Sequence, residues 1–135
     1  MNWVLWNNRL VKDGDIHLSK EDRGYQFGDG IYEVIRVYDG NMFTAKEHIN
    51  RFYNSADKIK LVVPFTKDVF HKMLYELIEA NEVTTGQVYV QITRGASPRQ
   101  HQFPTDVVEP VLTAYTKEVE RPVSQMANGV SAITV

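Results

Sequence analysis

The chain has 135 residues, of which 43% are hydrophobic and 24% are charged, and its formal net charge is −2. This length and composition fit one soluble globular domain, the small net charge gives no long-range attraction to nucleic acid or an anionic membrane, and no apolar run approaches the ~18 residues of a membrane span. There is no cysteine, which excludes disulfides and thiolate chemistry, and the start lacks the pattern of a signal peptide, so a cytoplasmic location is expected.

The beginning of the chain is predicted to form a hairpin, a loop and a strand. Val4–Leu10 mixes apolar and polar residues and leads to the turn-forming Asp13–Asp15, which indicates an opening hairpin. Ser19–Gly30 is polar and rich in glycine, as is typical of an ordered loop. Ile31–Tyr38 alternates apolar and polar residues as a strand does, and the Asp39-Gly40 turn follows it.

Two helices are predicted next. Thr44 and Glu47 have the spacing of a capping box, and the apolar residues that follow recur at helical spacing, which predicts a helix over Ala45–Lys60. A second apolar stripe predicts a helix from about Lys67 to Asn81, with Thr66 as its N-cap.

The last third is predicted to contain two strands joined by a loop. Gly86–Thr93 alternates as a strand, Ser97–Pro104 is a loop, and a second strand is expected at Val107–Thr116, where Pro110 indicates an edge position or a bulge. Strands, two helices and then strands predict an α+β fold: a two-layer, mostly antiparallel sheet with two helices packed on one face. Glu118–Asn128 is predicted to be a linker, and the chain ends inside a β-branched apolar run, which favours truncation at a domain boundary.

The loop after Gly86–Thr93 carries the best candidate for anion binding. Arg94, Arg99 and His101 lie in and beside it, and in extended backbone Arg99 and His101 project to the same side. A guanidinium matches a carboxylate, and an imidazole adds a third donor. The alternative is a solvated surface loop.

Other polar residues allow several interpretations. Gly28-Asp29-Gly30 is typical of a structural turn, while Tyr32 and Glu33 point to opposite faces of the predicted strand, so one of them is able to face a site. Arg51 lies on the polar side of its helix, where arginines are usually solvated; its functional interpretation is a cation for phosphate or carboxylate. The histidines lack metal-binding spacing, and we predict no metal site. A triad of Ser97, His101 and Asp106 has no supporting context.

Three segments together resemble bacterial D-amino-acid (D-alanine) aminotransferases, which are fold-type IV (branched-chain aminotransferase-like) pyridoxal-phosphate enzymes. The resemblance extends from about Leu5 to Ala132. It is carried by Glu21–Val34, by Met42–Thr44 with Glu47, His48 and Arg51, and by Thr93–Pro104 with its Arg-x-His pair.

The resemblance implies roles for particular residues. Tyr32, Arg99 and His101 are expected to bind the substrate α-carboxylate, with the Arg-x-His loop reaching the site of the other subunit of a homodimer. Arg51 is expected to bind the phosphate of pyridoxal 5′-phosphate, and Glu33 is expected to lie beside the site. Holding the carboxylate in one place decides which face of the α-carbon meets the cofactor, and so favours D-amino acids.

The implied reaction of the full-length enzyme converts D-alanine and 2-oxoglutarate into pyruvate and D-glutamate. Residues 1–118 would be the N-terminal domain, and 119–135 the interdomain linker and the start of a truncated C-terminal cofactor-binding domain. No lysine matches the family's catalytic lysine, so no catalytic residue is assigned and the chain is expected to be inactive alone. The lysines are Lys12, Lys20, Lys46, Lys58, Lys60, Lys67, Lys72 and Lys117.

Three alternatives remain open at this point. Branched-chain aminotransferases and aminodeoxychorismate lyases share the fold type, and both are expected to lack the Arg99-x-His101 pair in this setting. The third alternative is a non-catalytic binding domain. The partners expected from the resemblance are D-amino acids and 2-oxo acids.

Overall fold

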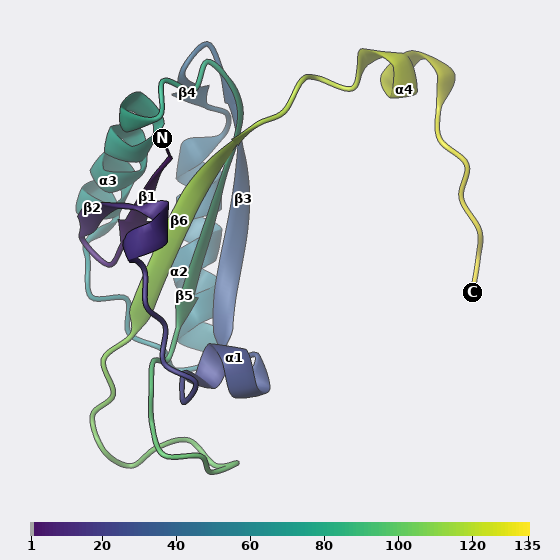
Figure 1. Ribbon diagram of the computed structural model, residues 1–135. Helices are drawn as coiled ribbons and strands as arrows, with labels where there is room; N and C mark the ends of the chain where they lie inside the picture. The colour runs from purple at the N-terminus through teal and green to yellow at the C-terminus, as the bar shows by residue number, and fades with distance from the viewer. Residues whose placement is uncertain (1) are drawn as a thin grey trace.

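The strands of the chain form one antiparallel sheet that is covered by helices on one face (Figure 1). This computed structural model describes residues 2–135, and the strand order is β2-β1-β6-β5-β3-β4. The strands are β1 (Trp3–Trp6), β2 (Arg9–Lys12), β3 (Gly30–Tyr38), β4 (Asn41–Met42), β5 (Thr85–Thr93) and β6 (Val111–Glu118). The helices are α1 (Arg23–Phe27), α2 (Ala45–Lys58), α3 (Lys67–Ala80) and α4 (Val123–Asn128), with a 3-10 turn η1 at Asp13–Asp15. The predicted α+β class, with α2 and α3 on one face of a mostly antiparallel sheet, is confirmed.

The alternation of apolar residues decides which face of the sheet is buried. On β3, Ile35 and Val37 are buried, whereas Tyr32 and Val34, which precede them in the strand, are exposed. On β5, Val88, Val90 and Ile92 are fully buried. Because successive strand side chains point to opposite faces, one face meets the helices and the other is left uncovered. The uncovered face of β3, β5 and β6 can be followed in Figure 1.

The core lies between the sheet and the two long helices. Helix α2 contributes Ile49, Phe52 and Ala56, and α3 contributes five residues that include Phe70. Phe52 and Phe70 stack with their ring centroids 4.7 Å apart, which joins the two helices. The predicted N-cap is confirmed, since the Thr66 hydroxyl accepts a hydrogen bond from the backbone N–H of Val69.

The predicted capping box of α2 is wrong. Thr44 has a φ of 51°, in the left-handed region, and its side chain makes no capping hydrogen bond. An N-cap side chain reaches the first-turn N–H groups from extended backbone. The tight connection from β4 imposes a different conformation on Thr44, although the helix itself forms as predicted.

Two further expectations need correction. The Ser19–Gly30 segment, predicted as an ordered loop without a regular element, contains α1, whose N-cap Asp22 accepts a hydrogen bond of 2.8 Å from Gly24 N. The last strand begins at Val111 rather than Val107, so Pro110 precedes it, and β6 lies between β5 and β1 instead of at an edge. The opening hairpin is confirmed, with its turn between Trp6 and Arg9 and the expected turn at Asp13–Asp15 following β2.

The C-terminal segment leaves the sheet after β6 (Figure 1). Helix α4 lies in the predicted linker, and every residue from Glu120 to Val135 is exposed. Within residues 2–135, no helix combines the length and apolar character needed to cross a membrane.

Candidate functional site

The uncovered face of the sheet presents Tyr32 to solvent. Its side chain is 63% exposed and stacks on Tyr89 at 5.7 Å between ring centroids, and Tyr89 stacks in turn on Tyr115 at 5.1 Å. Stacking fixes the direction of an exposed ring that would otherwise be free to turn. Tyr32 therefore presents its phenol from a fixed ring on the uncovered face.

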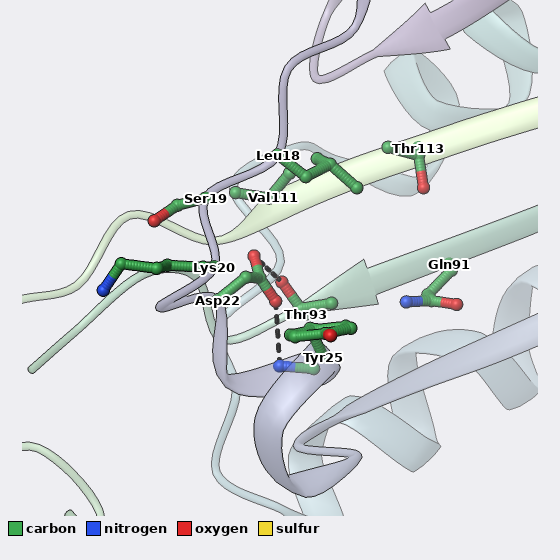
Figure 2. Close-up of a pocket in the computed structure, with 10 residues that line it drawn as sticks. Leu18, Ser19, Lys20, Asp22, Tyr25, Gln91, Thr93, Val111 and Thr113 are labelled. Atoms are coloured by element: carbon green, nitrogen blue, oxygen red, sulfur yellow. Dashed lines mark hydrogen bonds between the residues drawn. The ribbon is translucent and has the colours of Figure 1, made fainter. Parts of the chain in front are cut away.

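A pocket of about 490 Å³ opens on the same face, between α1 and strands β5 and β6. Figure 2 shows Asp22, Tyr25, Gln91 and Thr93 around it. The Asp22 carboxylate already accepts hydrogen bonds from Thr93 Oγ1, at 2.9 Å, and from the N–H of Gly24. Two of the polar side chains that line the pocket, Asp22 and Thr93, therefore already make hydrogen bonds within the chain.

On the opposite face, Glu33 joins β3 to α2. Its buried carboxylate accepts hydrogen bonds from Arg51 Nε (2.6 Å) and Nη2 (2.8 Å), and lies 2.8 Å from His48 Nδ1. Burial raises the pKa of Glu33, but the hydrogen bonds and charges of Arg51 and His48 outweigh it and hold this pKa below its usual value. Glu33 is therefore ionised and fixes the direction of Arg51, whose side chain is 67% exposed.

The loop between β5 and β6 carries Arg99 and His101, and both side chains lie against Phe27 of α1. The Arg99 guanidinium carbon is 5.1 Å from the Phe27 ring centroid, and the His101 ring centroid is 5.7 Å from it. Both residues are exposed. The structure thus brings the two predicted anion-binding residues together on one aromatic ring.

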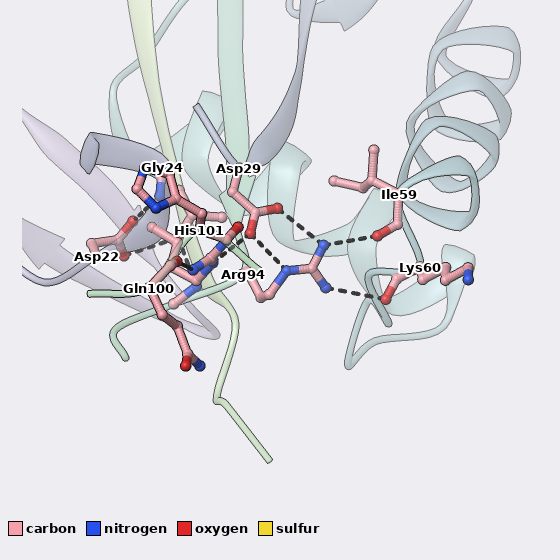
Figure 3. A network of polar contacts seen from close by, with 11 residues as sticks. Asp22, Gly24, Asp29, Ile59, Lys60, Arg94, Gln100 and His101 are labelled. Carbon is pink, nitrogen blue, oxygen red and sulfur yellow. Dashed lines mark hydrogen bonds and ion pairs between the residues drawn. The ribbon is translucent and has the colours of Figure 1, made fainter. Parts of the chain in front are cut away.

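Arg94, the third basic residue in and beside this loop, is not available to a ligand. Its Nε and Nη2 donate to Asp29 at 2.8 and 3.0 Å, and its guanidinium also donates to the carbonyls of Ile59 (2.8 Å) and Lys60 (3.2 Å). Figure 3 shows this arrangement. The expectation that Arg94 contributes to an anion trap is therefore wrong.

Asp29 also binds Arg23, which the sequence did not mark as important. Arg23 is 2% exposed and donates from Nε to Asp29 Oδ2 at 2.7 Å. Burial raises the pKa of Asp29, but hydrogen bonds and charge from Arg94 and Arg23 more than compensate and lower it. The only signal in the sequence was that charged residues interrupt a glycine-rich segment.

Not all predicted site residues meet within one chain. In residues 2–135, no hydrogen bond or aromatic contact joins Tyr32 to Arg99 or His101. They lie on either side of the Gly28–Gly30 turn, which lines both the small pocket of Tyr32 and that of His101. Ser97 and Asp106 make no side-chain hydrogen bond to His101 in the same range, so no nucleophilic triad is formed.

The fold is shared with solved aminotransferase structures. The branched-chain amino acid aminotransferase of Escherichia coli superimposes with a TM-score of 0.81 at 19% identity, covering 87% of this chain and 41% of that one. A second branched-chain amino acid aminotransferase, complexed with N-(5′-phosphopyridoxyl)-L-glutamate, also superimposes with a TM-score of 0.81, at 21% identity and with the same coverage of 87% and 41%. The family model for amino-transferase class IV matches residues 30–134. The chain belongs to the amino-transferase class IV family.

Curated relatives match along nearly the whole chain. The D-alanine aminotransferase of Listeria innocua is 51% identical over 133 residues, which cover 97% of this chain and 46% of the relative. That of Staphylococcus epidermidis is 48% identical over 134 residues, covering 99% of this chain and 48% of the relative. The chain spans about half the length of these relatives.

Proposed function

We propose that this chain is the N-terminal domain, residues 1–118, of a pyridoxal-phosphate-dependent D-amino-acid transaminase, followed in 119–135 by a linker and the start of a cofactor-binding domain. The proposed reaction of the full-length enzyme converts D-alanine and 2-oxoglutarate into pyruvate and D-glutamate. The observation that carries the proposal is the pairing of Arg99 and His101 on the Phe27 ring. Identity of 48–51% to D-alanine aminotransferases supports it.

The proposed substrate site combines two chains. Tyr32 does not contact Arg99 or His101 within the chain, yet all three are exposed and end in hydrogen-bond donors that suit a carboxylate. A homodimer in which the Arg99 loop of one subunit approaches Tyr32 of the other brings the donors together. The bound carboxylate then fixes the orientation of the α-carbon and thereby selects the D-enantiomer.

Arg51 is the proposed ligand of the cofactor phosphate. Its guanidinium is exposed, Glu33 holds it through Nε and Nη2, and within residues 2–135 its Nη1 makes no hydrogen bond. A fixed and exposed guanidinium edge suits a phosphate oxygen. Pyridoxal phosphate, when bound, supplies the electron sink that the reaction at the α-carbon needs. In this proposal Glu33 orients Arg51, and Arg51 orients the cofactor.

The 135-residue chain alone is proposed to be inactive. A catalytic lysine must be desolvated so that its amine is neutral. Within residues 2–135 no lysine is buried, and the half-buried Lys12 has its Nζ 3.1 Å from the centroid of the Trp3 ring. Transamination by the isolated chain in the presence of pyridoxal phosphate would contradict this part of the proposal.

Replacing Arg99 with Leu in the full-length enzyme tests the substrate role. The variant removes the guanidinium and keeps an apolar stem against Phe27. We expect the KM for D-alanine to rise by about tenfold to a hundredfold, the loss of a charge-assisted hydrogen bond to the substrate. Unchanged kinetics would reject the carboxylate role. A preference for branched-chain L-amino acids would favour the branched-chain aminotransferase alternative, and release of pyruvate from aminodeoxychorismate would favour the lyase.

A further inference from the structure

Arg23 contacts the main chain of the loop that carries the two anion-binding residues. Its Nη1 donates to the carbonyl of Gln100 at 2.7 Å and its Nη2 lies 3.5 Å from the carbonyl of His101. The Gln100 carbonyl lies between Arg99 and His101 in the chain, and the second carbonyl belongs to His101 itself. Arg23 is buried, and its own N–H donates to the carbonyl of Gly95 at 2.9 Å, at the other end of the loop. One residue thus holds the loop at two points.

Asp29 fixes the guanidinium that makes these contacts. Its side chain is 7% exposed and accepts from both Arg23 and Arg94. Arg94 in turn donates to the carbonyls of Ile59 and Lys60 at the end of α2. This series of contacts can be followed from Lys60 to Gln100 in Figure 3. A guanidinium held on several sides is a rigid support, because its planar fork loses little freedom for each hydrogen bond it forms. The support is continuous from the packed helix to the exposed loop.

The Phe27 ring contacts both Arg23 and the loop residue Arg99. Its ring centroid lies 4.7 Å from the guanidinium carbon of Arg23 and 5.1 Å from that of Arg99. Because α1 carries both Arg23 and Phe27, the short helix sets the backbone and the side chains of the loop together. A site on a loop binds tightly only where such supporting residues lock its geometry.

We propose that Arg23 is a positioning residue for substrate carboxylate binding: by holding the Gln100 and His101 carbonyls, it sets the direction of the Arg99 and His101 side chains. The inference rests on the proposed function, since it requires Arg99 and His101 to bind the carboxylate. Arg23 itself touches no substrate, as it is buried beneath the loop.

Steady-state kinetics of the full-length enzyme with D-alanine test the inference. We expect Arg23→Met to raise KM about tenfold or more with kcat changed by less than about threefold, because a displacement near 1 Å in a binding group costs up to about a hundredfold. Arg23→Lys, which keeps a cation beside Asp29 but cannot reach both carbonyls, should raise KM less. The control is Asn81→Ala, which loses half-buried hydrogen bonds to Trp3 and Thr116 far from the loop and should lower Tm without raising KM.

The double variant Arg23→Met with Arg99→Leu separates positioning from general damage. If Arg23 acts through the loop, part of its effect is lost together with Arg99, so the KM of the double variant rises by less than the product of the two single increases; if the two increases multiply in full, the positioning role is overturned. A KM for Arg23→Met within about twofold of the wild type, beside a raised KM for Arg99→Leu, overturns the positioning role and leaves the proposed function standing. An unchanged KM for Arg99→Leu overturns both the positioning role and the proposed function. Should Arg23→Met not fold, Arg23→Lys decides, and an unchanged KM there overturns the inference.

Discussion

The guanidinium of Arg51 makes two hydrogen bonds to the carboxylate of Glu33, with Nε 2.6 Å from Oε1 and Nη2 2.8 Å from Oε2. Glu33 is buried on the helix side of β3, and Arg51 reaches it from α2 with most of its side chain exposed. The contact ties α2 to the sheet and also directs Arg51. It therefore links the stability of the domain to the proposed cofactor site.

The pH dependence of stability follows from this pair. The folded pKa of Glu33 is lowered from its ordinary value of 4.5, so its contribution to stability is fully present above that value and is lost as the pH falls through the lowered pKa. We expect Tm to fall on acidification below about pH 4.5 and Glu33→Gln to flatten this slope. Glu76→Gln, which changes an exposed carboxylate beside Lys72, is the control. Equal slopes in Glu33→Gln and the wild type would show that Glu33 does not contribute.

Asp29→Asn should destabilise the domain more than Glu33→Gln does. The two arginine partners of Asp29 have side chains 3% and 12% exposed, whereas Arg51 is 67% exposed and is stabilised by water when its partner is lost. Removing one member of a buried ion pair costs about 3–5 kcal/mol. Urea unfolding of both variants measures the difference, and an equal or smaller loss for Asp29→Asn would contradict the structural role of the Arg23–Asp29–Arg94 network.

The two threonines that precede the long helices provide a matched pair. Thr66 caps α3 with its hydroxyl, so Thr66→Ala should cost about 1 kcal/mol of unfolding free energy. Thr44 makes no capping bond, so Thr44→Ala should change the unfolding free energy by less than about 0.5 kcal/mol. A loss for Thr44→Ala as large as that for Thr66→Ala would restore the capping box predicted from the sequence.

Those threonines also show how far the sequence predicts the fold. The apolar periodicity of both helices and of Gly86–Thr93 is local information, and it predicted the elements with ends within a few residues. The conformation of Thr44 depends on the turn that leads into the helix from β4. Capping residues were therefore predictable only where the preceding backbone is extended, as it is at Thr66.

The candidate site shows the same limit. Arg94 and Arg99 belong to one polar loop, and nothing local distinguishes them. Arg94 is bound by Asp29 and by carbonyls at the end of α2, residues distant in sequence, whereas Arg99 remains exposed on Phe27. The Arg-x-His spacing predicted the paired residues, but the burial of Arg23 and the hydrogen bonds of Arg94 depend on tertiary contacts that no short motif contains.

We expect the hydroxyl group of Tyr32 to contribute to substrate binding only. In the full-length enzyme, Tyr32→Phe keeps the stack on Tyr89 and removes one hydrogen-bond donor. We expect KM for D-alanine to rise about threefold to tenfold, the loss of roughly 0.5–1.5 kcal/mol. Tyr115→Phe, at the far end of the same tyrosine stack, should leave KM unchanged. Equal effects of the two substitutions would place the substrate elsewhere.

Mixed dimers of the full-length enzyme show whether Tyr32 of one subunit and the Arg99–His101 pair of the other bind one carboxylate. A dimer of one Tyr32→Ala subunit and one Arg99→Leu subunit then contains one site with both defects and one intact site, because each site takes its parts from both chains. We predict that the mixed dimer regains about half of the wild-type kcat/KM for D-alanine, while both parent homodimers stay low. A mixed dimer no more active than the mean of its parents would contradict it.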